Sequence, residues 1–292
     1  MKSGFVSIIG RPNSGKSTLL NRLVKEKVSI VTDKPQTTRH VVKGIVTGPE
    51  GQAVFLDTPG IHKPIYRMNE RMMKSVRDSM SDVDIILLIV DASSAFGRGD
   101  EFALELLKPV SSKKFLLLNK IDRIQKKNLL PLIDRYSKLV DFDEIIPISA
   151  LKGDNVESLL AQVFKYLPEG PMYYPPDQIS DQQERTIAAE TVREKLIDLT
   201  EQELPHSTAV VIDRFEEEGN LYRIYVSIYI ERESQKKIVI GKGGEKLKEV
   251  GTAARKELES FFDKKVFLEL HVKVKKNWRD DPETLRSLGL GD

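Results

Sequence analysis

The sequence predicts an α/β domain with a doubly wound, mostly parallel sheet, followed by a smaller α+β domain. Over roughly the first 170 residues, continuous apolar runs such as "DIILLIVD" alternate with amphipathic helical stretches, as in parallel sheets covered on both faces. After a proline-rich stretch, the pattern changes to alternating strands around helices. A length of 292 residues suits two domains that each bury a core.

The first strand is expected at residues 4–9, and "GRPNSGKS" follows it before a helix at 16–25. The spacing G-x-x-x-x-G-K-[ST] is that of the P-loop, whose backbone N–H groups wrap a phosphate at a helix N-terminus. Lys16 is expected to reach the outer phosphates and Ser17 to ligate Mg²⁺. Taken alone, the pattern is also compatible with a glycine-rich turn. The expected nucleotide contacts here are Gly10, Arg11, Pro12, Asn13, Ser14, Gly15, Lys16, Ser17 and Thr18.

Strands are expected next at 41–47 and 52–57, and the second ends in "DTPG". In this motif Asp57 can face Mg²⁺ through water and the Gly60 N–H can meet a γ-phosphate, with Thr58 and Pro59 between them. A helix over 67–80 follows. Its apolar residues recur every four positions, which is typical of a core-facing helix: Met68, Met72, Val76 and Met80.

A strand at 84–91, a helix at 100–107 and a strand at 114–119 come next, and "NKID" closes the last of them. An ionised carboxylate only accepts hydrogen bonds, and guanine offers N1–H and N2–H₂ donors side by side, whereas adenine offers an acceptor at N1. A buried Asp122 facing adenine would be left desolvated, at a cost of about 1–3 kcal/mol or more. Asp122 therefore predicts guanine and opposes the alternative of an ATP-using enzyme, and Asn119 and Lys120 are expected beside it.

A helix at 126–139, a strand at 145–149 and a helix at 154–167 complete the first domain. The motif "ISALKG" follows the last strand, at the sheet edge where ligands of such folds bind. The Ala150 N–H is expected to read the guanine O6 carbonyl, with Ser149 and Leu151 on either side of it.

Together, these motifs resemble the GTPase class of P-loop proteins. The resemblance implies that Thr38 of "PQTTR" ligates Mg²⁺ and touches the γ-phosphate, with Thr37 as the alternative. Ile61 stands where many small GTPases carry a glutamine that orients water, so intrinsic hydrolysis is expected to be slow. Asn13 is expected to help hold K⁺ beside the phosphates, or else to cap the loop. The catalytic set is thus Lys16, Thr38, Gly60 and Asn13, and His40 and His62 are interpreted as solvated switch residues.

We expect a GTPase domain at 1–170, a linker at 171–183 and a second domain at 184–292. Prolines and polar residues in "PEGPMYYPPDQISDQQ" break both periodicities and favour a moderately stiff linker. The second domain is expected to contain a helix at 184–203, the strands "STAVVIDRF" and "YRIYVSIYI", a helical stretch across the "GKGG" turn, and a strand at 266–274.

The G-x-x-G pattern at 241–244 is weak by itself, since "GPEG" at 48–51 also matches. Its position before an amphipathic helix in a β-rich domain resembles a KH domain, whose loop clamps single-stranded RNA. Charge supports this interpretation, because residues 236–279 hold 13 Lys and Arg against 6 Asp and Glu, a net charge of +7, whereas 184–235 carry a net charge of −6. The alternative is a solvated helix turn. The expected RNA contacts are Ile240, Gly241, Lys242, Gly243, Gly244, Lys236, Lys237 and Lys246, with Lys248 on the approach.

Trp278, the only tryptophan, is compatible either with stacking on a base or with packing of the tail. Composition adds limits of its own. The absence of cysteine rules out disulfides and cysteine metal sites, the formal net charge is only +2, and the apolar N-terminal run is too short for a signal peptide. The run "IILLIV" at 85–90 is too short to span a membrane.

The combination of "PNSGKSTLLN", "QTTRH", "DTPG", the linker "PPDQISD" and a KH-type domain resembles the bacterial Era family over essentially the whole chain. The resemblance implies GTP and GDP as ligands with Mg²⁺, and K⁺ as a further ion. It also implies binding to the 3′ end of 16S rRNA and a role in maturation of the small ribosomal subunit. We expect a cytoplasmic monomer, with peripheral association at the inner membrane as a further implication. The alternative is a signalling GTPase whose basic half binds an acidic membrane or protein surface.

Overall fold

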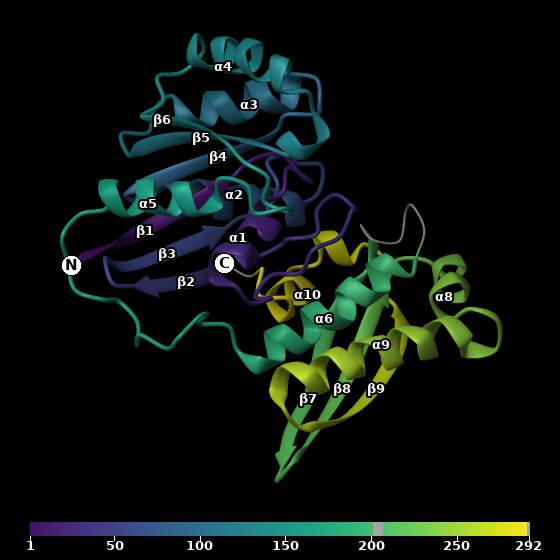
Figure 1. Cartoon of the computed structure of the whole chain (residues 1–292). Helices are drawn as coiled ribbons and strands as arrows, with labels where there is room; N and C mark the ends of the chain where they lie inside the picture. The colour runs from purple at the N-terminus through teal and green to yellow at the C-terminus, as the bar shows by residue number, and fades with distance from the viewer. Residues whose placement is uncertain (201–206, 291–292) are drawn as a thin grey trace. The chain divides into compact units, whose positions relative to one another are not determined.

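The first part of the chain forms a six-stranded sheet with strand order β2-β3-β1-β4-β5-β6 (Figure 1). The computed structural model describes residues 1–200 and 207–290. All neighbouring strands are parallel except β2 and β3, which are antiparallel. The strands are β1 (Lys2–Ile9), β2 (Val42–Gly48), β3 (Gly51–Asp57), β4 (Ile85–Asp91), β5 (Lys113–Asn119) and β6 (Glu144–Pro147).

Helices cover both faces of this sheet, so the predicted doubly wound fold is confirmed. One apolar core joins α1 and α5 to one face, and a second joins α2, α3 and α4 to the other. The expected core face of the helix after "DTPG" is confirmed, because its methionines and Val76 are at most 4% exposed. The helices are α1 (Lys16–Val24), α2 (Arg67–Ser81), α3 (Arg98–Leu107), α4 (Leu129–Ser137) and α5 (Val156–Tyr166), with 3-10 turns at Ile121–Arg123 and Lys126–Asn128.

The second part is an α+β unit with a three-stranded sheet of order β7-β8-β9. β7 and β8 are antiparallel, whereas β8 and β9 are parallel. α6 and α9 pack on this sheet and enclose one apolar core. The elements are α6 (Glu184–Asp198), β7 (Ala209–Glu218), β8 (Leu221–Ile230), α8 (Glu233–Ile240), α9 (Glu245–Phe262), β9 (Lys265–Val274) and α10 (Pro282–Ser287), with 3-10 turns at Lys242–Gly244 and Trp278–Asp280.

Three details of the second unit differ from the expected elements. The helix expected at 184–203 ends at Asp198, and residues 201–203 of that expectation lie outside the described residues. The apolar run before "GKGG" belongs to a helix of its own, α8, and the short helix α10 was not expected.

The proline-rich segment is attached to the edge of the first sheet. By their contacts, Met1–Ile65 and Asn69–Asp181 form one compact unit, and Tyr66–Met68 and Gln182–Asp292 form the other. The Ile45 N–H donates to the Ile179 carbonyl at 2.9 Å, and Lys43 pairs with Asp181 at 2.6 Å. This segment therefore continues the hydrogen bonding of strand β2.

Candidate functional site

The P-loop lies between β1 and α1, at the carboxyl ends of the parallel strands. Gly15 has φ 101°, and a Cβ there would lie 2.2 Å from Asn119 Nδ2, so this position requires glycine. The buried Lys16 ammonium donates to the carbonyls of Gly10 and Arg11, at 3.3 and 3.0 Å. Burial lowers the pKa of Lys16 to about 8, and the charge of Asp57 opposes this shift.

Three residues expected at the magnesium ion meet beside the P-loop. Ser17 Oγ donates to Asp57 Oδ2 at 2.6 Å and lies 2.9 Å from Thr38 Oγ1. Asp57 is buried, and burial raises the pKa of its carboxyl group against the opposing effects of Lys16 and of hydrogen bonds from Ser17, Ser29 and Thr38. Among the described residues, no partner bonds to the buried Asp57 Oδ1. Hydroxyl and carboxylate oxygens with one acceptor left over suit a hard cation such as Mg²⁺.

Thr37 and Thr38 face different partners. Thr37 Oγ1 donates to the Lys34 carbonyl and lies 2.7 Å from Thr32 Oγ1, within its own loop. Thr38 Oγ1 instead lies beside Ser17 Oγ, at the proposed position of the metal. The geometry therefore favours Thr38 as the ligand.

One pocket contains residues of the P-loop, of "NKID" and of "ISALKG". It is lined by these expected residues: Pro12, Asn13, Gly15, Lys16, Ser17, Thr18, Thr37, Thr38, Gly60, Asn119, Lys120, Asp122, Ala150 and Leu151. Seven expected contacts lie outside its lining: Gly10, Arg11, Ser14, Asp57, Thr58, Pro59 and Ser149. The other lining residues were not among the expected contacts: Ile30, Val31, Thr32, Asp33, Gln36 and Arg123.

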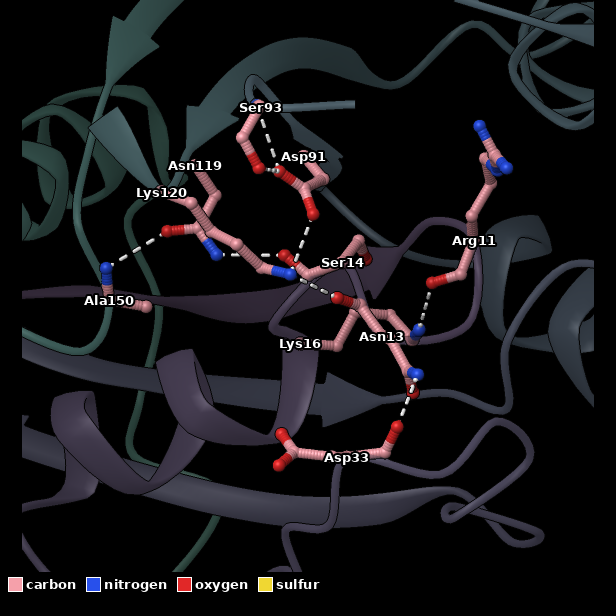
Figure 2. A network of polar contacts seen from close by, with 10 residues as sticks. All are labelled: Arg11, Asn13, Ser14, Lys16, Asp33, Asp91, Ser93, Asn119, Lys120 and Ala150. Atoms are coloured by element: carbon pink, nitrogen blue, oxygen red, sulfur yellow. Dashed lines mark hydrogen bonds and ion pairs between the residues drawn. The ribbon is translucent and has the colours of Figure 1, made fainter. Parts of the chain in front are cut away.

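Asn119 joins the P-loop to the base end of the pocket. Its Nδ2 donates to the Ser14 carbonyl at 2.8 Å, and its Oδ1 accepts the Ala150 N–H at 2.9 Å (Figure 2). The N–H expected to read guanine O6 is thus engaged by Asn119. Asp122 accepts a hydrogen bond from Ser149 Oγ at 2.6 Å and is exposed, not buried as expected, so any desolvation of its carboxylate has to come from the base itself.

Lys120 and Asn13 connect the P-loop to its neighbours. Lys120 Nζ donates to the Asn13 carbonyl and to Asp91 Oδ2, both at 2.7 Å, and Asn13 Nδ2 donates to the Asp33 carbonyl at 2.8 Å (Figure 2). Burial opposes ionisation of Asp91, but hydrogen bonds from Lys120 and Ser93 outweigh it and lower its pKa. Sequence reasoning missed Asp91, because only the fold brings it beside Lys120, and with it Ser93, which donates to Asp91.

Several expected residues direct their side chains elsewhere. The Arg11 guanidinium pairs with the buried Asp100 at 2.8 Å and points away from the rest of the network in Figure 2. Thr58 Oγ1 donates to the Ile8 carbonyl at 2.8 Å. Ile61 is 1% exposed in the apolar core, so its side chain has no role in orienting water.

His62 is not a solvated residue as expected. Its Nδ1 donates to the Gly60 carbonyl at 2.7 Å, and its Nε2 is buried without a partner among the described residues. His40 is half-buried.

In the second unit, "GKGG" forms a tight turn between α8 and α9. Gly241, Gly243 and Gly244 have φ of 74°, 62° and 85°, a region that favours glycine. Lys237, Lys242 and Lys248 are exposed, whereas Lys236 and Lys246 are half-buried. None of these five lysines forms an ion pair in the part of the chain that the structure describes. The turn therefore presents backbone and unpaired ammonium groups to solvent.

Trp278 is fully buried, and its indole N–H donates to the Ser207 carbonyl at 2.9 Å. Of the two interpretations of this residue, packing of the tail is confirmed, and stacking of an exposed ring on a base is excluded in this conformation.

Comparison with known proteins matches both units. A family described as "50S ribosome-binding GTPase" matches residues 5–120, and a family described as "KH domain" matches residues 203–279. The structure of Era in complex with MgGDPNP and nucleotides 1506–1542 of 16S ribosomal RNA is 43% identical, with a TM-score of 0.97 over 100% of both chains. A tyrosine-to-alanine variant of Era from Aquifex aeolicus, bound to GDP and AlF₄⁻, is also 43% identical, with a TM-score of 0.96 over 100% of both chains.

Two features are absent from the described residues. None of the helices described has the length and apolar character needed to cross a membrane. Within residues 1–200 and 207–290, no group of three or more His, Asp or Glu side chains is placed to hold a metal ion.

Proposed function

This chain belongs to the Era family of GTPases, and on that premise we propose that it is a GTP-hydrolysing switch that binds the 3′ end of 16S rRNA and assists maturation of the small ribosomal subunit. One observation carries the proposal: the chain matches, over its full length, an Era structure that holds both MgGDPNP and this RNA. The matching family description names the 50S particle, but 16S rRNA belongs to the small subunit, which is why we propose that partner.

The nucleotide would bind in the pocket between the P-loop and "NKID". Lys16 would meet the outer phosphates, Asp122 the guanine donors, and the Gly60 N–H the γ-phosphate. Ser17, Thr38 and Asp57 would hold Mg²⁺, which supplies positive charge to the phosphates when bound. The unpartnered Asp57 Oδ1 supports this assignment.

The base specificity can be tested by replacing one hydrogen-bond acceptor of Asp122 with a donor. An Asp122→Asn variant would present one donor and one acceptor, which suits the N1–H and C2 carbonyl of xanthine rather than the two donors of guanine. We expect the wild type to bind GTP well ahead of ATP, and the variant to prefer xanthosine triphosphate. Equal competition by ATP and GTP in the wild type would contradict the proposal.

RNA binding can be tested separately with an oligonucleotide of the 16S 3′ end and a shuffled control. Lys242→Ala should weaken binding of the first oligonucleotide and leave GTP binding unchanged, since the two sites belong to different units. The alternative partner, an acidic membrane, predicts that anionic vesicles displace the RNA at fixed salt. Location in the cytoplasm, peripheral membrane association and a monomeric state remain proposals that the same vesicles, cell fractionation and sedimentation would test.

We further propose that hydrolysis is slow and stimulated by K⁺. Asn13 and Asp33 both line the pocket, and the Asn13 Nδ2 group donates to the Asp33 carbonyl at 2.8 Å, which holds the Asn13 side chain at the pocket wall. Hydrolysis should be faster in KCl than in NaCl at equal ionic strength, and Asn13→Ala should remove the difference. Equal rates in the two salts for the wild type would exclude K⁺ stimulation and leave Asn13 as a loop cap.

A further inference from the structure

Ser29 contacts the proposed magnesium carboxylate from outside the nucleotide pocket. It is 4% exposed, and its Oγ donates to Asp57 Oδ2 at 2.9 Å. Ser17 and Thr38 line the pocket, whereas Ser29 does not. Its hydroxyl thus reaches the same carboxylate as Ser17, but from a position that the nucleotide does not share.

Asn21 of α1 fixes the backbone of this serine. Asn21 Oδ1 accepts the N–H groups of Val28 and Ser29 at 3.0 and 2.9 Å, and its Nδ2 donates to the Ser29 carbonyl at 2.7 Å. Both backbone polar groups of Ser29 are therefore bound to one side chain of the helix that follows the P-loop. The protein itself therefore holds the backbone from which the Ser29 hydroxyl reaches Asp57.

Asp57 needs such a partner because its carboxylate is taken out of water. Buried charge is costly unless hydrogen bonds compensate it. Ser17 and Thr38 are proposed to be Mg²⁺ ligands, whereas Ser29 is not, so its hydroxyl serves only to bind Asp57. Oδ2 is then held by serines, and the buried Oδ1 remains as the free acceptor among the described residues.

We propose that Ser29, held by Asn21, is a positioning residue that orients the Asp57 carboxylate for the magnesium shell. Ser29 acts through Asp57 and touches neither nucleotide nor metal, and the inference rests on the proposed Mg²⁺-dependent GTP binding.

The test is the rate of release of radiolabelled GDP, measured by filter binding over a series of Mg²⁺ concentrations. Hydrogen bonds to charged groups are strong enough that Ser29→Ala should raise the Mg²⁺ concentration at half-effect by about tenfold or more. In excess EDTA, release from the variant and the wild type should be equally fast, which also shows that the variant is folded. Ser29→Thr keeps the hydroxyl and should restore the wild-type Mg²⁺ dependence.

A matched control is Ser227→Ala, which removes another buried serine that donates to an aspartate, Asp213, but in the second unit. Its Mg²⁺ dependence should equal that of the wild type. An unchanged Mg²⁺ midpoint in Ser29→Ala would overturn the inference while leaving the proposed function intact. If Mg²⁺ does not slow GDP release even in the wild type, the proposed magnesium site itself is wrong.

Discussion

Lys16 has opposite effects on stability and on binding. Lys16 is 5% exposed, and burial lowers the pKa of its ammonium group from 10.5 to about 8. Because the unfolded chain holds this proton more tightly, the stability of nucleotide-stripped protein should rise with pH between about 8 and 10.5. At pH 7 the buried charge of Lys16 therefore lowers the free energy of unfolding, and bound phosphates would compensate for this loss by pairing with the charge.

Lys16→Met should accordingly stabilise nucleotide-stripped protein at neutral pH while abolishing GTP binding. We expect a gain of about 1–3 kcal/mol in the free energy of unfolding, the upper end following from the size of the pKa shift and the lower end from two lost hydrogen bonds to carbonyls. Urea unfolding at neutral and alkaline pH measures this, and the gain should shrink as the pH rises. A variant less stable than the wild type at every pH would show that the hydrogen bonds of Lys16 dominate.

At the scale of elements, Gln52 ties the proline-rich segment to the sheet. This fully buried side chain donates to Thr47 Oγ1 and the Tyr174 carbonyl at 3.0 and 2.9 Å. Its Oε1 accepts the N–H groups of Tyr173 and Tyr174 at 2.8 and 2.9 Å. All four hydrogen-bonding positions of the amide are therefore used.

Gln52→Leu should leave three backbone groups and one hydroxyl without their partner and destabilise the protein by about 2–4 kcal/mol. Limited proteolysis should then cut within residues 171–181. As a control, Lys43→Met removes a partly exposed ion pair with Asp181 and should cost under about 1 kcal/mol. Resistance of the Gln52 variant to protease would mean that other contacts hold this segment.

The contrast between these elements explains what the sequence could predict. Strands such as "DIILLIVD" and the helix with Val76 are predictable because the pattern that identifies them is local and continuous. The attachment of the linker is not, since it depends on a glutamine more than a hundred positions earlier in the chain. The same holds for Ser29 and Asp91, because their partners Asp57 and Lys120 are far away in the sequence. Lys16 and Ser17, in contrast, belong to a motif with fixed spacing.

At the scale of the whole molecule, charge is divided between segments of the second unit. Residues 236–279 carry a net charge of +7 within a chain of net charge +2. Each phosphate of a single strand that a protein neutralises contributes about −0.7 to the slope of log K against log salt. If Lys236, Lys237, Lys242 and Lys246 each meet a phosphate, the slope for the 16S 3′ end should be about −3.

Lys242→Ala should reduce this slope by about 0.7 in magnitude, as measured by filter binding over a series of KCl concentrations. Lys108→Ala, which removes an exposed lysine paired with Glu105 in the first unit, should leave the slope unchanged. A slope near zero for the wild type would mean that the lysines around "GKGG" do not meet phosphates.

The buried Trp278 is an intrinsic fluorescent probe of the second unit. The sequence has no other tryptophan, and this one lies in the second unit with its indole N–H bonded to the Ser207 carbonyl. The emission maximum of Trp278 should lie at short wavelength in the folded protein and shift to longer wavelength when unfolding exposes the indole ring to water. Unfolding of the second unit can therefore be followed without an added dye, whereas unfolding of the first unit, which holds no tryptophan, has to be followed by another signal such as circular dichroism.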